Sequence, residues 1–289
     1  MRKPTNIGAS VRARLANLAR QRQQPFQVLL TRYVLERLLY RLSTTPHRER
    51  LVLKGAMLLT SWFTDPLRPT QDLDLLGFGN SDASKMLEVF REVCAVSVDD
   101  GVEFDVAGLT IEPIREELEY GGLRLKTNAT IDGARIRVIV DIGFGDAVEP
   151  AEIVLPVLPV LLDLPAPTLR AYPPETVIAE KFQEMVMLGR ANSRMKDFYD
   201  IWVLSRSQQI ADDRLARAIR AKFDRRSTPV PTSPPDCLTQ EFATDTTKAQ
   251  QWSSFVRDVA TQPGSLTTVV ADLEAFPMPH AQAADKLPD

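Results

Sequence analysis

Apolar residues recur every three to four positions along the first part of the chain, which is the spacing of helices that bury one face. This spacing predicts two helices within residues 8–43. Residues 50–63 then fit a short strand followed by a helix that begins near Gly55, where glycine allows a change of backbone direction.

The pattern next changes to the alternation of β-strands, with one helix among them. Residues 71–78 alternate apolar and acidic positions, and residues 81–95 return to helical spacing after a Ser-Asp start. Asp132-Gly133 is a typical hairpin turn between two strands. The further strands expected here are residues 102–114, 121–133 and 134–146.

Helical spacing dominates the C-terminal part, after a proline-punctuated stretch at 150–174. The helices predicted there are residues 175–190, 193–207, 211–226 and 247–261. A linker-like loop is expected at 228–236 and a polar tail from about 262. The pattern therefore predicts two domains, residues 1–170 and 171–289.

The composition is that of a globular protein: 289 residues, 44% apolar and 25% charged. The most apolar stretch, residues 153–165, is shorter than the ~20 residues of a membrane span and is broken by prolines. The N-terminus lacks the apolar core of a signal peptide, so we expect a cytoplasmic protein without a membrane contact. With two separated cysteines and two histidines, chemistry must come from carboxylates, lysines and hydroxyls.

A net charge of −3 hides two basic segments. Residues 1–22 carry six Lys/Arg and no acid, and residues 214–226 carry six basic residues and one aspartate. Such segments suit a polyanionic partner, although ordinary solvated helix faces have the same composition. The charged residues of 97–119 are mostly acidic and would suit a cationic small molecule instead.

Two carboxylates stand one residue apart in the predicted strand 71–78. Alternate side chains of a strand share a face, so Asp72 and Asp74 repel each other unless something offsets their charge. Mg²⁺, or alternatively Mn²⁺, prefers such oxygen ligands together with substrate phosphates. Solvated strands, glycosyltransferases and phosphatase-like hydrolases also carry such pairs, so the surroundings must decide.

A third carboxylate is expected on a neighbouring strand. Asp141 directly follows the apolar run 138–140, where an unpaired acid would be costly, and Asp146 is the fallback. Together with Asp72 and Asp74, Asp141 would complete a two-metal site for phosphoryl or nucleotidyl transfer.

Groups suited to a phosphate stand on either side of the acidic pair. Lys54 and Gly55 lie where strand gives way to helix, so backbone N–H groups can approach a phosphate, although a simple turn also explains the glycine. Arg68 and Thr70 immediately precede the acids, where an arginine can grip a phosphate oxygen.

Charged residues also interrupt two of the predicted C-terminal helices. Lys181 is flanked by apolar positions, and Asp197 and Asp200 share one face of the next helix. One interpretation assigns them to the same catalytic site. In the other, Lys181 is a surface residue and the acids form a local ion-pair cluster with Arg194 and Lys196.

Five short motifs follow one another in the order LKGAML (53–58), RPTQDLDL (68–75), DIGFGD (141–146), KFQEMVMLGR (181–190) and KDFYDIWVL (196–204). In this order they resemble the AbiEii/AbiGii toxin family of nucleotidyltransferase-like proteins, which includes the MenT toxins. The resemblance implies an α+β fold of the DNA polymerase β-like nucleotidyltransferase type. A mixed β-sheet would form the N-terminal lobe and helices the C-terminal lobe.

The resemblance also implies a function. The chain would be the toxin of a bacterial toxin–antitoxin or abortive-infection system, tied to phage defence, with a cognate antitoxin as partner. Its activity would be Mg²⁺-dependent transfer of nucleotides from an NTP to RNA, with the tRNA 3′ end as the expected acceptor, which blocks translation.

Site roles follow from the same resemblance. The expected metal ligands are Asp72, Asp74 and Asp141. The expected NTP-binding residues are Lys54, Gly55, Arg68, Thr70 and Lys181. Asp197 would position Lys181 or orient the attacking hydroxyl, and the supporting residues would be Lys196, Asp200 and Asp146.

One departure and two alternatives stand beside this assignment. Ala56 follows Gly55 where nucleotidyltransferases generally have serine, so a hydroxyl for the phosphate is absent. The alternatives are transfer to a small-molecule or protein hydroxyl, and a degenerate protein that only binds NTP or a partner. Phosphorylation of Thr70 is one way in which an antitoxin would neutralise the enzyme.

Overall fold

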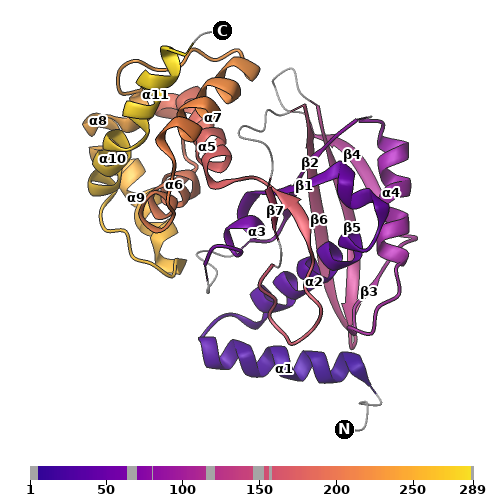
Figure 1. Cartoon of the computed structure of the whole chain (residues 1–289). Helices are drawn as coiled ribbons and strands as arrows, with labels where there is room; N and C mark the ends of the chain where they lie inside the picture. The colour runs from indigo at the N-terminus through magenta and orange to yellow at the C-terminus, as the bar shows by residue number, and fades with distance from the viewer. Residues whose placement is uncertain are drawn as a thin grey trace. The chain divides into compact units, whose positions relative to one another are not determined.

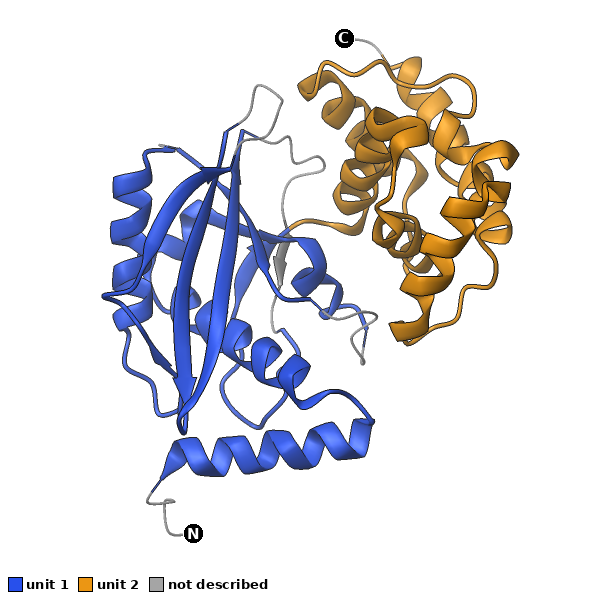
Figure 2. Cartoon of the chain, turned by 180° about the vertical axis from the view of Figure 1, so that it is seen from behind, with its two compact units in different colours: residues 1–145, 154–171 blue, residues 146–153, 172–289 orange. Residues whose placement is uncertain are grey.

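The computed structural model describes residues 6–63, 70–79, 81–114, 121–145, 153–155 and 158–287. The chain divides into two compact units, coloured separately in Figure 2. Unit 1 comprises residues 1–145 and 154–171, and unit 2 comprises residues 146–153 and 172–289. Each unit has its own set of buried apolar side chains.

Eight strands of the described chain form one mixed sheet (Figure 1). They are β1 (Leu51–Lys54), β2 (Leu73–Gly77), β3 (Glu103–Phe104), β4 (Thr110–Ile114), β5 (Gly122–Ile131), β6 (Ala134–Phe144), β7 (Ile153–Leu155) and β8 (Leu169–Ala171). Their order is β3-β5-β6-β2-β1-β8-β7, and β4 pairs with β5 beside β3. The central strands β2 and β6 run parallel, whereas β1 and β5 are antiparallel to their central neighbours.

Alternation along β5 and β6 separates an apolar face of the sheet from a polar one. Val138 and Val140 on β6 are completely buried, and Arg137 and Asp141 point to the opposite face. Helix α2 (Phe26–Ser43) packs against β6, and helix α4 (Ala83–Ala95) packs against β4 (Figure 1). The polar face therefore carries the charged side chains of the central strands.

The two N-terminal helices predicted within residues 8–43 are confirmed. Helix α1 (Ile7–Arg22) begins at Asn6, whose side chain accepts a hydrogen bond from the backbone of Ala9 at 2.9 Å. Helix α2 is buried along most of its length and includes Arg41. The Arg41 guanidinium donates to both carboxylate oxygens of buried Asp100 and to three backbone carbonyls, so this arginine is structural.

From Tyr172 onward, the described part of unit 2 consists of helices and the loops that connect them. Its α-helices are α5 (Pro174–Leu188), α6 (Met195–Ser207), α7 (Asp212–Arg225), α8 (Gln240–Thr244), α9 (Thr246–Phe255), α10 (Leu266–Ala275) and α11 (Pro277–Asp285). Helix α5 packs against α6 and α7 through buried aromatic residues, among them Phe182 and Phe223 with ring centroids 5.6 Å apart. The expected fold class, a mixed sheet followed by helices, is confirmed. No helix of the described residues is long and apolar enough to cross a membrane.

Three details of the expected element pattern are wrong. The strand expected over 102–114 is divided into β3 and β4, because residues 105–109 form a turn in which Asp105 accepts from the backbone of Gly108. Strands β7 and β8 lie within the proline-punctuated stretch, where prolines masked the strand pattern. The helix expected over 247–261 ends at Phe255 and continues as a short 3₁₀ turn.

The polar tail expected from about 262 also contains two helices. Ser265 caps α10 by accepting from the backbone of Thr268 at 3.1 Å. Leu266, Val269 and Leu273 of α10 are buried at helical spacing, so the sequence signal was present but short. The predicted hairpin turn is confirmed, with positive φ values of 46° at Asp132 and 76° at Gly133.

Candidate active site

Four charged side chains form one row across four neighbouring strands of unit 1. Lys54 on β1 pairs with Asp74 on β2, and Asp74 pairs with Asp141 on β6. Asp141 pairs in turn with Arg124 on β5. Directly opposite residues of a sheet share a face and have Cβ atoms about 5 Å apart, so these charges are neighbours. The row reads positive, negative, negative, positive across the polar face.

Asp72 adds a third carboxylate beside this row. It precedes Asp74 by two residues and is half-buried. The hydroxyl of Thr70 donates to Asp72 Oδ1 at 3.0 Å and lies 3.2 Å from the Asp72 carbonyl oxygen. Thr70 therefore orients the Asp72 carboxylate, which gives this threonine a role besides the expected contact with the NTP.

Arg124 is the residue of this site that sequence analysis missed. Its Nε and Nη2 donate to Asp141 Oδ1 and Oδ2 at 2.8 and 2.7 Å, a bidentate pair. The hydrogen bond to Asp141 raises the pKa of the Arg124 guanidinium, and the charges of Asp141 and Asp72 add to the effect. The signal that could have found it was the predicted two-residue Asp132-Gly133 turn, because a hairpin loop of that length fixes the register and sets residue 124 opposite residue 141.

Gly55 makes the position of Asp74 possible. Its φ of 70° is unfavourable for other residues, and a Cβ atom there would lie 2.0 Å from Asp74 Oδ2. Gly55 also begins α3 (Gly55–Leu59), which is a single short turn. The ammonium of Lys54 crosses the same face and lies 3.6 Å from the position that a Cβ on Gly143 would occupy. Close packing against Asp74 therefore explains Gly55, whereas a Cβ at Gly143 would make only an ordinary contact with Lys54.

The oxygen ligands of this site suit a hard cation that takes most of its other ligands from phosphates and water. No three His, Cys, Asp or Glu side chains in the described part of the chain are grouped closely enough to hold a metal alone. Asp72 and Asp74 provide only carboxylate oxygens, which fits Mg²⁺ or Mn²⁺ held by one or two carboxylates with phosphates and water. Asp141 has both oxygens on Arg124. Arg68 and Asp146 lie outside the described residues.

Unit 2 brings three of the other predicted residues together. The ammonium of Lys181 on α5 lies 2.9 Å from Asp197 Oδ1 and 2.8 Å from Asp200 Oδ2, both on α6. The Lys181 side chain is 10% exposed, and the two aspartates are completely buried. The contact favours positioning of Lys181 as the role of Asp197.

Arg194, whose side chain is 40% exposed, joins this cluster at its solvent side. Its Nε donates to Asp197 Oδ2 at 2.6 Å, and its guanidinium also pairs with Glu184. Burial alone would raise the pKa of Asp197, but the charges of Lys181 and Arg194 outweigh it and hold this pKa below its ordinary value. Lys196 is exposed, so the ion-pair cluster includes Arg194 and leaves Lys196 at the surface.

The basic segment 214–226 is largely compensated within unit 2. Arg217 pairs with Asp213 at 2.9 Å and Arg220 with Asp224 at 2.7 Å, each one helical turn apart. Lys222 is buried, with its ammonium 3.7 Å from Glu180. These pairs favour the interpretation of this segment as an ordinary helix face.

A different basic surface lies on the polar face of the sheet. Arg135 and Arg137 on β6 are exposed and share the face of Asp141, at alternate positions of the strand. Lys126 on β5, which shares this face, pairs with Glu112 of β4. Neither Arg135 nor Arg137 forms a hydrogen bond or ion pair with another described residue. The face is thus positive beside the carboxylates.

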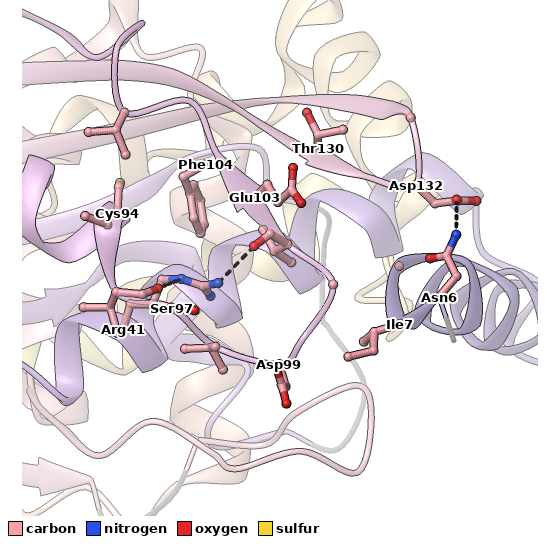
Figure 3. A pocket seen from close by; sticks show the side chains of 18 residues that line it. Asn6, Ile7, Arg41, Cys94, Ser97, Asp99, Glu103, Phe104, Thr130 and Asp132 are labelled. Carbon is pink, nitrogen blue, oxygen red and sulfur yellow. Dashed lines mark hydrogen bonds between the residues drawn. The ribbon is translucent and has the colours of Figure 1, made fainter. Parts of the chain in front are cut away.

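A pocket of about 840 Å³ lies elsewhere in unit 1 (Figure 3). Asp99, Glu103 and Asp132 are among its lining residues, together with the start of α1. It includes Thr130 of β5, six residues from Arg124, which is about 20 Å along a strand. This acidic pocket is therefore remote from the row of charges and does not present a ligand to it.

Comparisons with known proteins agree with the fold and with the family that the motifs indicate. The family model described as "Nucleotidyl transferase AbiEii toxin, Type IV TA system" matches residues 37–277. The crystal structure of JHP933 from Helicobacter pylori superposes with a TM-score of 0.50 at 16% identity, covering 90% of this chain and 92% of that one. That of a provisionally assigned nucleotidyltransferase from H. pylori gives the same TM-score and identity, with coverages of 90% and 95%. No curated protein sequence matches the chain.

Proposed function

Because the chain belongs to the AbiEii family of nucleotidyltransferase toxins of type IV toxin–antitoxin systems, we propose that it transfers a nucleotide from an NTP to RNA. The acceptor in this proposal is the 3′ end of tRNA, and its modification blocks translation. A cognate antitoxin is implied by the family.

The observation that carries the proposal is the row of charges on the polar face, with Asp72 beside it. Asp72 and Asp74 would hold Mg²⁺, or Mn²⁺, and Asp141 is the third carboxylate next to them. A cation bound there would polarise the α-phosphate and offset the negative charge of the departing pyrophosphate. A Ser/Thr hydroxyl, an acidic pair and a glycine that makes room for one of the acids are all present.

The reaction itself would be an in-line displacement. The acceptor 3′-oxygen bonds to the α-phosphorus, the bond from that phosphorus to the oxygen bridging to the β-phosphate breaks, and pyrophosphate leaves. The hydroxyl proton passes to solvent. Lys54 and Arg124 would supply positive charge beside the reacting phosphates. The proposed part of Lys181 in neutralising triphosphate charge rests on the family alone, since Asp197 and Asp200 hold its ammonium.

The exposed arginines of β6 support an RNA acceptor. Arg137 and Arg135 precede Asp141 by four and six residues, which places them about 13 and 20 Å from it along the strand. A single-stranded 3′ end lying along β6 toward Asp141 would pass both guanidinium groups. The small-molecule alternative has less support, because the acidic pocket in Figure 3 is remote from the carboxylates.

Incubation of purified protein with total bacterial RNA, Mg²⁺ and each NTP labelled at the α-phosphate tests the proposal. Label in tRNA-sized bands, lost in Asp72→Asn and retained in Glu112→Gln, is the expected result. Glu112 is a matched control because it is an exposed carboxylate on β4, next to the same strand β5. Label in protein or in a small molecule would mean that the acceptor is not RNA. NTP binding without transfer would favour the degenerate alternative.

Salt dependence of RNA binding tests the acceptor surface separately. Replacing Arg135 and Arg137 by glutamine should lower the slope of log affinity against log salt by roughly 0.7 for each lost phosphate contact. The same replacement at Arg217 and Arg220, which are paired within α7, should leave the slope unchanged. Equal effects of the two double variants would contradict the assignment of β6 as the RNA surface.

A further inference from the structure

The polar face holds two cationic side chains beside three carboxylates. Asp74 lies directly opposite Asp141, and Asp72 precedes Asp74 by two residues. Lys54 and Arg124 stand at the two ends of the row. The carboxylates would repel strongly without these cations. Internal positive charge therefore already balances part of the negative charge that a divalent cation would neutralise.

Arg124 competes directly for one of these carboxylates. Its two hydrogen bonds, 2.8 and 2.7 Å, engage both oxygens of Asp141. A bidentate guanidinium occupies one lone pair on each oxygen, and its positive charge disfavours a cation at the lone pairs that remain. Asp141 therefore binds a metal ion more strongly when Arg124 moves away.

The pair is built so that it can open. The Arg124 side chain is 39% exposed and that of Asp141 is 19% exposed, so water reaches the guanidinium. Ion pairs at this exposure are weakly held compared with buried pairs. The Arg124 side chain is also long and flexible. Once its guanidinium leaves Asp141, it can bind a phosphate on the same face of the sheet.

From these contacts we infer that Arg124 is an exchangeable counter-ion of Asp141, an inference that rests on the proposed function. Arg124 holds Asp141 when cation and NTP are absent. When they bind, it releases Asp141 to the cation and turns to a phosphate oxygen of the NTP. Arg124 is thus a positioning residue whose pairing sets the strength of cation binding.

Titration of the full-length protein with Mn²⁺, followed by electron paramagnetic resonance of the free ion, tests this inference without turnover. Arg124→Gln should bind Mn²⁺ about fivefold more tightly, because a pair of this exposure is worth about 1 kcal/mol. Lys126→Gln removes the same charge from the same face of β5, but its partner is Glu112, so it should change the affinity much less. In an Asp141→Asn background, Arg124→Gln should give no gain.

The opposite sign is expected for the nucleotide. With a non-hydrolysable NTP and Mn²⁺, Arg124→Gln should weaken NTP binding severalfold, because the released guanidinium no longer reaches a phosphate. Arg124→Lys, which keeps the charge but cannot pair at both oxygens, should retain much of the NTP affinity and share the gain in Mn²⁺ affinity.

Three outcomes would overturn the inference. They are unchanged Mn²⁺ affinity in Arg124→Gln, an equal gain in Lys126→Gln, and a gain that persists with Asp141→Asn. If wild-type protein bound no Mn²⁺, or if Asp72→Asn left its affinity unchanged, the proposed function would fail and the inference with it. Thermal unfolding of each variant checks that the fold is retained.

Discussion

Each unit places cationic side chains next to carboxylates, but the two clusters differ in their access to water. In unit 1, Arg124 and Asp141 are 39% and 19% exposed on an open sheet face. In unit 2, Lys181 is 10% exposed, and Asp197 and Asp200 are completely buried between α5 and α6. In the sequence the two clusters look alike, because Asp72 with Asp74 and Asp197 with Asp200 are both acidic pairs near a basic residue.

The difference in burial separates a site that can exchange partners from one that holds the fold. Charged side chains on the sheet face can leave an internal ion pair and bind a ligand with a small change in free energy, because water screens the separated charges. The buried charges of unit 2 satisfy each other, and removal of one partner leaves the other uncompensated. Substitutions should therefore affect activity without stability in unit 1, and stability first in unit 2.

The largest expected effect is the loss of activity in Asp74→Asn. The substitution keeps the shape beside Gly55 but removes a charge needed to hold the metal, so transfer should fall by about 10³-fold or more. The unfolding midpoint should stay close to that of the wild type, because removing one of three neighbouring carboxylates also relieves repulsion. Labelled-NTP transfer and thermal unfolding measure the two properties, and Glu112→Gln serves as the control. If transfer by Asp74→Asn were as fast as by the wild type, Asp74 would not be a metal ligand of the active site.

The second expected effect is a loss of stability in Lys181→Met. Two completely buried aspartates lose their shared ammonium, which should cost about 3–5 kcal/mol in the unfolding of unit 2. Trp202 and Trp252 lie in unit 2, so urea unfolding followed by tryptophan fluorescence in a Trp62→Phe background reports on this unit.

Lys196→Met is the control for this measurement, because Lys196 is exposed on the same α6 helix. Its unfolding free energy should lie within about 0.5 kcal/mol of the wild type. If Lys181→Met were as stable as Lys196→Met and only transfer were lost, the division between an active cluster and a structural one would be wrong. Loss of activity in Lys181→Met alone does not distinguish these roles.

How far the sequence predicts this molecule depends on whether the information is local. The strand that carries Asp74 and the strand-to-helix change at Gly55 follow from neighbouring residues and are confirmed, although β2 begins at Leu73 and leaves Asp72 just before it. The two strands of 150–174 and the two helices after 262 were missed because prolines and short apolar runs weaken the pattern.

Pairing between strands that are distant in the sequence is the information that the pattern lacks. The two-residue Asp132-Gly133 turn implies that β5 pairs with β6 and that residue 124 lies opposite Asp141, but nothing local says that β6 pairs with β2 or that Asp74 lies opposite Asp141. Burial is similarly non-local, since Lys181 and Lys54 both lie near apolar residues in the sequence. The structure encloses the first and places the second on the sheet face.

A smaller effect separates the two possible reasons for Gly55. Gly55 and Gly133 have similar φ values of 70° and 76°, but a Cβ at Gly55 would collide with Asp74, and one at Gly133 meets nothing within 4 Å. Alanine at either position should cost about 1 kcal/mol from backbone strain. Only Gly55→Ala should also reduce transfer strongly, because Asp74 must move. Equal transfer activities in the two variants would reduce Gly55 to a turn residue.

The smallest expected effect is an acid sensitivity confined to unit 2. The pKa of Asp197 is held below its ordinary value of 3.8 in the fold, so its ionised form stabilises the folded unit. This contribution is complete above the unfolded pKa and is lost as the pH falls through that value toward the lowered one. Urea unfolding of the Trp62→Phe protein should therefore show the unfolding free energy of unit 2 falling between about pH 5 and pH 3.

Asp197→Asn should unfold more easily at pH 6 but with a shallower dependence of its unfolding free energy on pH. Asp213→Asn, at an exposed position on α7, should keep the wild-type slope, because little of its ion pair with Arg217 is shielded from water. An unchanged slope in Asp197→Asn would mean that another carboxylate governs acid unfolding of unit 2, and that the buried cluster is less tightly coupled to the fold than its burial indicates.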